Sequence, residues 1–332
     1  MTADAVLRRL ENASSAQVAD VLALVRAEHG RLAGDLPGAR KLFGTLVSGT
    51  GSPLVRKLAL SFLAETLAAA EEVEAAEALL VDSGFDRLIA EGGTIRPLLL
   101  AARGAVRLVA GRFSEAFEDL SACVRLPKAE LSAHTAVLRC RGLMALAAAG
   151  EGRHQEARAA ARVEQEIALT WGAPAYVGWA LYVRAIVDDE NATKRLEDAI
   201  DLLDVARSPV ALARASHELG VRLVAEGDHA AAKRRFERAG QLARRIGNER
   251  LAARVDEALS GFTDFDQRFS LTVQELKIAE LARTGYSNKQ IAERLVLTVR
   301  TIEFHLSNVY RKLGVSGRRE LMDGTSIVPR PD

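Results

Sequence analysis

Four short segments of this chain share a glycine that is followed, five residues later, by an alanine. They are GDLPGA (34–39), GRFSEA (111–116), GRHQEA (152–157) and GDHAAA (227–232). Each lies between two apolar stretches with helical spacing, as in RGAVRLVAGRFSEAFEDL. Glycine permits the left-handed turn that ends a first helix, and alanine lets a second helix approach closely. The pattern therefore predicts helical hairpins joined by tight turns.

The spacing of these turns predicts two further hairpins. The intervals between the four glycines are 77, 41 and 75 residues, and two of them are close to twice 38. The degenerate segments EEVEAAEALL (71–80) and NATKRLEDAIDLL (191–203) are the candidates for the missing pairs. Six stacked hairpins would form an α-solenoid over residues 1–259, whose concave groove is a binding surface. The pattern resembles tetratricopeptide repeats, although its period exceeds their usual length of about 34 residues and its aromatic consensus is poor.

The composition favours an all-α fold without a membrane segment. Ala, Leu and Arg, which are strong helix formers, dominate the sequence, and only eight prolines occur. No run of 18 apolar residues and no apolar signal-peptide stretch is present, so we expect a soluble, cytoplasmic protein with no membrane partner. Cys123 and Cys140 stand apart, without CxxC or metal-ligand spacing. We expect them to be small buried residues in a reducing compartment.

Known catalytic patterns are missing from the sequence. The six histidines show neither HExxH nor HxH spacing, and neither GxSxG nor GxxxxGK[ST] occurs. The chain is therefore predicted not to be an enzyme, and no cofactor or metal site is expected.

One aromatic cluster, within WGAPAYVGWALYVRA (171–185), is a candidate ligand surface of the predicted groove. Aromatic side chains at helical spacing can stack on a ligand or a peptide. Filling the core between hairpins is the more frequent role of such residues, so both interpretations stay open. The groove candidates are Trp171, Tyr176, Trp179 and Tyr182.

The repeat pattern stops after residue 259. Residues 260–269, with Gly261 and three irregularly placed phenylalanines, are interpreted as a linker. Two capping boxes follow, TVQE (272–275) and SNKQ (287–290), in which a hydroxyl and a carboxyl or amide group satisfy the free N–H groups of a helix start. Residues 270–324 are therefore predicted to form a second helical domain, followed by a tail at 325–332.

The helices of this second domain have the lengths of a helix-turn-helix. Gly285 ends the first helix, and a short helix at 288–295 follows. After a three-residue turn, Thr298 caps a long helix that Gly314 ends, and Ser316 caps a last helix through Met322. A short helix, a tight turn and a longer helix predict a four-helix domain of the helix-turn-helix type.

The long helix, within VRTIEFHLSNVYRKLGV (299–315), carries two different faces. Ile302, Leu306, Val309 and Leu313 form an apolar stripe, which we expect to pack on Ile278, Leu281, Ile291 and Leu295. Arg300, Glu303, Phe304, Ser307 and Arg311 form a second stripe about half a turn away. Residues 281–319 hold eight Lys or Arg against two Glu, a balance of +6. A subdomain that merely caps the solenoid explains the first stripe only, whereas a helix placed in the major groove of DNA explains both.

The segment LTVQELKIAELARTGYSNKQIAERLVLTVRTIEFHLSNVYRKLGVSGRREL (271–321) resembles the LuxR-type helix-turn-helix of bacterial transcription regulators. The helical repeats ahead of it resemble the C-terminal part of the large ATP-binding LuxR regulators, a group that includes the maltose-regulon activator. In that group an ATPase domain precedes the repeats, and this chain lacks one. It is interpreted as either a short relative or a piece of a longer regulator.

The resemblance implies roles for individual residues. Base-contact candidates are Glu303, Phe304 and Ser307, since Glu accepts from cytosine and Phe contacts the thymine methyl. Phosphate-contact candidates are Lys289, Arg300, Thr301, Asn308, Arg311 and Lys312. Many relatives carry proline where this chain has Val299, and the last helix, 317–322, corresponds to the family's usual dimer contact.

The resulting prediction is a sequence-specific, DNA-binding transcription regulator. Its expected partners are double-stranded DNA, a second copy of the chain on DNA, RNA polymerase, and an unidentified small-molecule or protein effector at the repeats. The alternative is a helical-repeat scaffold for protein interaction whose DNA binding is secondary. Selective DNA binding separates the two.

Overall fold

The computed structural model describes residues 15–49, 51–125, 139–269, 271–313 and 315–323. The described residues form eighteen α-helices and no strand, which confirms the all-α prediction. They divide into two compact units, Met1–Asp256 and Glu257–Asp332. The predicted tail at 325–332 lies outside the described residues. Of the described helices, none has the length and apolarity needed to cross a bilayer.

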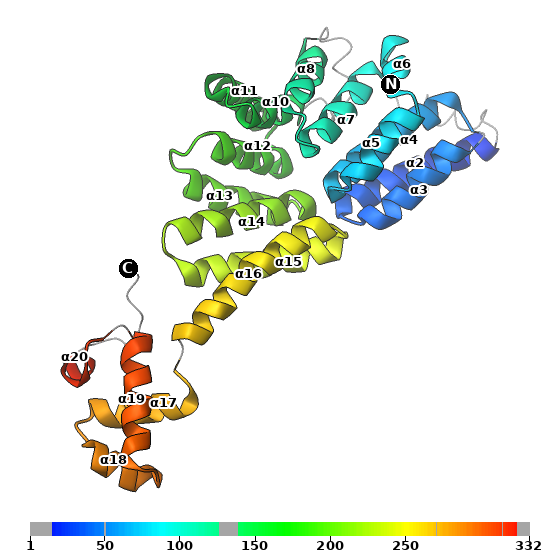
Figure 1. Cartoon of the computed structure of the whole chain (residues 1–332). Helices are drawn as coiled ribbons and strands as arrows, with labels where there is room; N and C mark the ends of the chain where they lie inside the picture. Colours follow the sequence, from blue (N-terminus) through cyan, green and yellow to red (C-terminus); the bar gives the residue numbers. More distant parts are fainter. Residues whose placement is uncertain (1–14, 50, 126–138, 270, 314, 324–332) are drawn as a thin grey trace. The chain divides into compact units, whose positions relative to one another are not determined.

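Unit 1 is a series of helix pairs, each of which packs on the next (Figure 1). The first three pairs are α2 (Ser15–Ala33) with α3 (Leu36–Ser48), α4 (Pro53–Ala70) with α5 (Val73–Asp82), and α7 (Arg96–Val109) with α8 (Phe113–Val124). The last three are α10 (Cys140–Gly150) with α11 (His154–Trp171), α12 (Pro174–Val187) with α13 (Ala192–Val205), and α14 (Pro209–Ala225) with α15 (His229–Ile246). A short helix, α6 (Phe85–Ala90), precedes α7. A helix pair is thus found at each of the four glycine turns and at each of the two degenerate segments. The likeness to tetratricopeptide repeats stays a prediction.

The turns between paired helices have the geometry that the glycine pattern predicts. Gly111 and Gly227 have φ angles of 75° and 83°, in the left-handed region. The alanines five residues later, Ala116 and Ala232, are fully buried where the two helices of a pair meet. In the second pair, Glu71 occupies the glycine position with a φ of 60°. A non-glycine residue in this conformation is strained, so its side chain must have a compensating role.

That role lies in a set of contacts between the second pair and the end of unit 1. Arg254 of α16 (Glu249–Phe269) pairs with the Glu71 carboxylate at 2.8 Å, and Arg214 of α14 approaches it at 3.6 Å. The amide of the buried Asn248 donates to the carbonyl of Ala69 at 3.0 Å. We call these four residues, Glu71, Arg214, Asn248 and Arg254, the clasp.

The first pair also touches the last. A Cβ atom placed on Gly34 would lie 2.5 Å from Cγ of Pro209, and one on Gly247 would lie 2.6 Å from Cγ of Pro37. Glycine is therefore required at both positions by close approach as well as by its positive φ. With the clasp, these contacts bring the beginning and the end of unit 1 together (Figure 1).

The two cysteines are buried, as predicted, but they are also neighbours. Their Sγ atoms are 3.2 Å apart where α8 and α10 pack together, and both are free thiols. The hydrogen bond to Cys123, followed by burial, raises the pKa of the Cys140 thiol well above its usual value. A thiol with a raised pKa is a poor nucleophile at neutral pH, so Cys140 fits a packing role, whereas the same hydrogen bond lowers the pKa of the Cys123 thiol.

The predicted linker at 260–269 is not irregular. The helix α16 continues through Phe269. The phenylalanines at 262, 265 and 269 are three and four positions apart, which is helical spacing, and a single glycine costs a helix only about 1 kcal/mol.

Candidate nucleic-acid interface

Unit 2 contains four short helices after α16. They are α17 (Val273–Arg283), α18 (Asn288–Leu295), α19 (Val299–Leu313) and α20 (Arg318–Asp323). Both predicted capping boxes are present. The Thr272 hydroxyl accepts from the Glu275 backbone N–H at 3.2 Å, and the Ser287 hydroxyl accepts from that of Gln290 at 3.3 Å. The helix starts of the helix-turn-helix are therefore set by local side chains.

The apolar stripe of α19 forms the core of this unit. Ile302, Leu306 and Val309 are buried in one cluster with Ile278 and Ile291. The other three predicted core residues are half-buried around it, namely Leu281, Leu295 and Leu313. The predicted packing is confirmed, and it fixes which side of α19 faces outward.

The turn between α18 and α19 contains a strained residue. Val296 has a φ of 54° and an almost fully exposed side chain. The Thr298 hydroxyl then accepts from the Thr301 backbone N–H at 3.2 Å and caps α19, as predicted. Gly314, the predicted end of this helix, lies outside the described residues.

The second stripe of α19 is exposed. Glu303, Phe304 and Ser307 all face away from the core, and Phe304 is 66% exposed. Its ring meets that of the neighbouring His305 edge-on, with centroids 5.8 Å apart, and it lies outside the buried cluster of the unit. The Ser307 hydroxyl donates to the backbone carbonyl of Glu303 at 2.9 Å, which leaves its lone pairs open to a donor.

The candidate phosphate contacts fall into two groups. Lys289, Arg300 and Arg311 are exposed and make no hydrogen bond or ion pair with the rest of the described chain. Lys312 instead pairs with Glu275 at 2.6 Å, with side chains only 12% and 6% exposed. Of the two polar candidates, Asn308 is half-buried, and the Thr301 hydroxyl lies 2.8 Å from that of Thr298.

Glu275 therefore has two partners, Thr272 of the predicted capping box and Lys312, which the sequence did not indicate. Burial opposes its ionisation, but hydrogen bonds from Lys312 and Thr272 lower its pKa below the usual value. The carboxylate both caps α17 and holds the last turn of α19. Lys312 is 37 residues away in sequence, so no local pattern could have indicated the pair.

Two other basic residues of this unit also have internal partners. The guanidinium of Arg294 lies 5.2 Å from the ring centroid of Tyr286 and donates to its hydroxyl at 3.0 Å. Arg318 donates to the Asn288 side chain at 2.8 Å and to the backbone carbonyl of Tyr286. Neither partner is a carboxylate, so both charges still contribute to a positive surface.

The aromatic candidates of the repeats do not share one environment. Trp179 is only 4% exposed and packs against Gly142, whereas Trp171 is 60% exposed. Tyr176 lies edge-on to Trp171 with ring centroids 6.4 Å apart, and Tyr182 is half-buried beside Trp179. The space beside Trp171 and Tyr176 is about 10 Å³, which is room for no more than one water molecule.

The part of the chain that is described shows no metal-binding group. No three His, Cys, Asp or Glu side chains there are grouped so that they could hold a metal ion. The exposed face of α19 is thus the most distinctive surface of unit 2.

The segment that carries this surface matches a known protein family. Residues 269–324 match GerE, the bacterial regulatory proteins of the luxR family. An HTH-type transcriptional regulator of Mycobacterium bovis and one of Mycobacterium tuberculosis are each 46% identical over 54 residues, 16% of this chain and 6% of theirs. The oxygen regulatory protein NreC of Staphylococcus aureus is 42% identical over 53 residues, 16% of this chain and 24% of its own.

The family match lies over the segment that folds as α17 to α20, and the repeats of unit 1 lie outside it. The alignments cover 6% of the mycobacterial proteins and 24% of NreC. Both the capping boxes and the two-faced α19 lie inside the family match. Residues 269–324 are therefore a DNA-binding helix-turn-helix domain of the luxR family.

Proposed function

We propose that this chain is a sequence-specific transcription regulator in which unit 1 receives an effector or a partner and unit 2 binds DNA. The observation that carries the proposal is the outward stripe of α19, where exposed polar and aromatic side chains are flanked by cations that have no partner among the described residues. Such a helix fits the major groove, where side chains contact base edges while cations contact phosphates.

Within this proposal the stripe residues have distinct roles. Glu303 accepts a hydrogen bond from a cytosine amino group, Phe304 contacts a thymine methyl, and Ser307 accepts from or donates to a base edge. Phosphates are bound by Lys289, Arg300, Thr301, Asn308 and Arg311. We assign Lys312 to the stability of the domain, because Glu275 occupies its ammonium group.

We also propose that the chain forms a homodimer on DNA, and the support for it comes from α20 alone. Leu321 of α20 is buried in the core of its own unit, whereas Met322 is exposed. A dimer contact through α20 would therefore use Met322 and the polar residues beside it. RNA polymerase is a further proposed partner, since a regulator of this family acts on transcription.

Selection from a pool of random DNA duplexes tests the proposal with the full chain. We expect one motif to be enriched, with two-fold symmetry and half-sites about one helical turn apart if the dimer is the active form. Enrichment should be lost in Arg300→Ala/Arg311→Ala, which removes two exposed cations without touching the core. If the full chain binds all duplexes equally, the regulator proposal is wrong and the scaffold alternative is preferred.

A further inference from the structure

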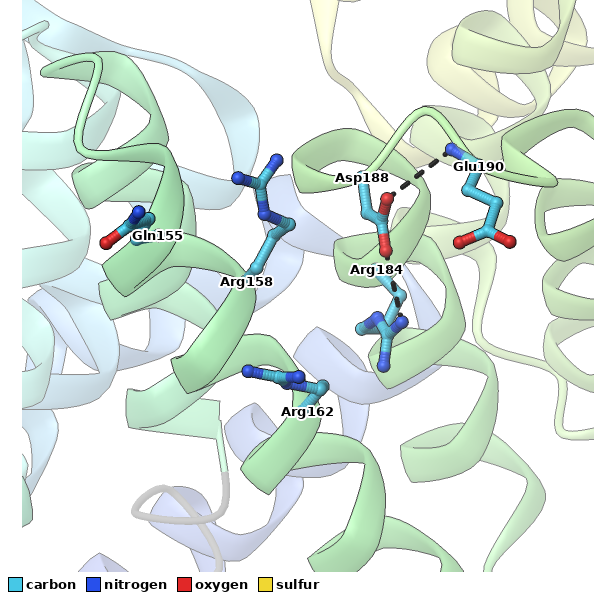
Figure 2. Close-up of a pocket in the computed structure, with 6 residues that line it drawn as sticks. All are labelled: Gln155, Arg158, Arg162, Arg184, Asp188 and Glu190. Atoms are coloured by element: carbon cyan, nitrogen blue, oxygen red, sulfur yellow. Dashed lines mark hydrogen bonds and ion pairs between the residues drawn. The ribbon is translucent and has the colours of Figure 1, made fainter.

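A polar hollow of about 410 Å³ lies between α11 and the end of α12 (Figure 2). Helix α11 contributes residues at spacings of three and four, which share one face of the helix. Helix α12 and the turn after it contribute the opposite side. The lining residues are Gln155, Arg158, Arg162, Arg184, Asp188 and Glu190, which we call the arginine hollow.

On the opposite side of the arginine hollow, Arg184 and Asp188 pair with each other, whereas the exposed carboxylate of Glu190 makes no ion pair with a described residue. Arg184 donates to Asp188 and to Gln165, each at 3.2 Å. Arg195 approaches Asp188 at 3.6 Å. Burial opposes ionisation of Asp188, but hydrogen bonds from the Glu190 backbone and from Arg184 lower its pKa below the usual value. Asp188 is thus an anion committed to two arginines, and it does not neutralise α11.

Arg158 and Arg162 on α11 are not paired. Both are exposed, and neither makes a hydrogen bond or an ion pair with any described residue. Like charges one turn apart on a helix repel each other. Elsewhere on the same helix pair the arrangement differs, since Arg153 is paired with Glu156 at 2.5 Å. The two free guanidinium groups at the edge of a hollow therefore form an open anion-binding position.

The lining also defines the chemistry of the ligand. It includes no apolar side chain, so the site does not suit an apolar molecule. Guanidinium groups bind the paired oxygens of phosphates and carboxylates in a bidentate manner. A volume of about 410 Å³ is within the range of small-molecule sites.

We infer that the arginine hollow binds a small polar molecule with a doubly charged oxyanion group, either a phosphate ester or a dicarboxylate. Arg158 and Arg162 hold the oxyanion, and Gln155 and Glu190 receive hydroxyl or amino groups of the same molecule. The inference that this site binds an oxyanion depends only on the geometry of the hollow. Its role as the effector site of a regulator rests on the proposed function.

Calorimetric titration of the full chain tests the inference, with pyrophosphate as the phosphate probe and citrate as the carboxylate probe. We expect saturable binding of one or both, and the stronger probe identifies the class of oxyanion. Arg158→Ala/Arg162→Ala should weaken binding by about tenfold or more, since hydrogen bonds to charged groups are strong. Arg158→Lys/Arg162→Lys keeps the charge but loses the planar forks, and should give an intermediate loss.

Arg234→Ala/Arg245→Ala is the matched control. It removes two exposed arginines of α15 that have no partner among the described residues, so the change in net charge is the same. Binding should stay within about twofold of the natural chain, because neither residue is near the hollow. Equal weakening in both double variants, or no saturable binding of either probe, overturns the inference.

DNA binding of the same variants separates the two proposals. Selective DNA binding without probe binding overturns the arginine hollow and leaves the regulator intact. Saturable probe binding without DNA selectivity leaves the hollow and overturns the proposed function. If both hold, the probe should change the DNA affinity of the natural chain and should have no effect on that of Arg158→Ala/Arg162→Ala.

Discussion

Glu71 and Arg254 are 183 positions apart and form a two-point ion pair, with N–O distances of 2.8 and 3.2 Å. Glu71 holds a left-handed backbone conformation, which glycine occupies at positions 34, 111, 152 and 227. The strain of this conformation is offset by a carboxylate that joins the second helix pair to α16. A local departure from the repeat pattern is thus explained by a distant contact.

Replacement of Glu71 separates the backbone effect from the ion pair. Glu71→Ala and Glu71→Gly both remove the carboxylate, but only glycine relieves the positive φ. We expect Glu71→Gly to be more stable than Glu71→Ala by about 1 kcal/mol. Urea unfolding followed by tryptophan fluorescence measures this, because both tryptophans lie in unit 1. Equal stability of the two variants would show that the turn is not strained.

The two tryptophans should differ sharply in their effect on stability. Trp179→Ala empties a buried site beside Gly142 and should cost about 3–5 kcal/mol. Trp171→Ala changes an exposed residue and should alter stability by less than about 0.5 kcal/mol. Thermal unfolding followed by circular dichroism compares them. If Trp179→Ala keeps its stability but loses response to an effector, the residue belongs to a ligand surface.

Glu164 makes the stability of unit 1 depend on pH. Burial raises its pKa to about 7, and one carboxylate oxygen has no hydrogen-bond partner within the described structure. A folded-state pKa above the unfolded value adds stability that is fully present below about pH 4.5 and is lost as pH rises through 7. Glu164→Gln cannot ionise, so its advantage should grow by roughly 2.5 kcal/mol between about pH 5 and pH 8. Urea unfolding at the two pH values measures the difference, and a constant one would contradict the buried carboxyl.

Arg311 and Lys312 are adjacent in sequence, but their replacement should have different effects, on DNA affinity and on stability respectively. Arg311→Ala removes an unpartnered cation, so DNA affinity should fall about equally on all sequences and the salt slope should drop by about one. Lys312→Ala leaves Glu275 buried without its cation and should destabilise unit 2 by roughly 3 kcal/mol. Salt-dependent DNA titration and thermal unfolding are measured for both. A stable Lys312→Ala with a reduced salt slope would return Lys312 to the phosphate contacts.

Glu303 and Ser307 should affect selectivity rather than general affinity. Glu303→Ala and Ser307→Ala should each relax preference at one or two base pairs by about 1–3 kcal/mol, with little change in the salt slope. Leu306→Ala is the control for folding, because it removes a buried core residue and should abolish both properties. Titration against single-base variants of the selected site measures this. Unchanged preference in both variants would show that the second stripe does not contact bases.

Features set by neighbouring residues could be predicted from the sequence. The glycine turns, both capping boxes and the two faces of α19 depend on residues a few positions apart, and the structure has them where the pattern indicated. The continuity of α16 was missed, because one glycine was given more weight than the helical spacing of the phenylalanines.

Features that depend on distant residues could not be predicted. The pairing of Lys312 with Glu275, the proximity of Cys123 to Cys140 and the clasp join segments whose approach is decided by packing of whole helices. The arginine hollow was missed for the same reason. Arg158 and Arg162 look like an ordinary charged helix face until the end of α12 is placed opposite them.

The clasp also imposes an order on synthesis. Asn248 is translated 179 residues after Ala69, whose carbonyl it binds, so the early hairpins leave the ribosome before the helix that completes their packing exists. Helices in ordinary repeat arrays are stabilised by their neighbours alone and can form one after another. Here the first hairpins reach their final stability only once α16 has been translated, and α16 is the same helix that runs on toward the DNA-binding residues. Completion of the repeat unit is thereby tied to the point in translation at which the DNA-binding domain begins to emerge.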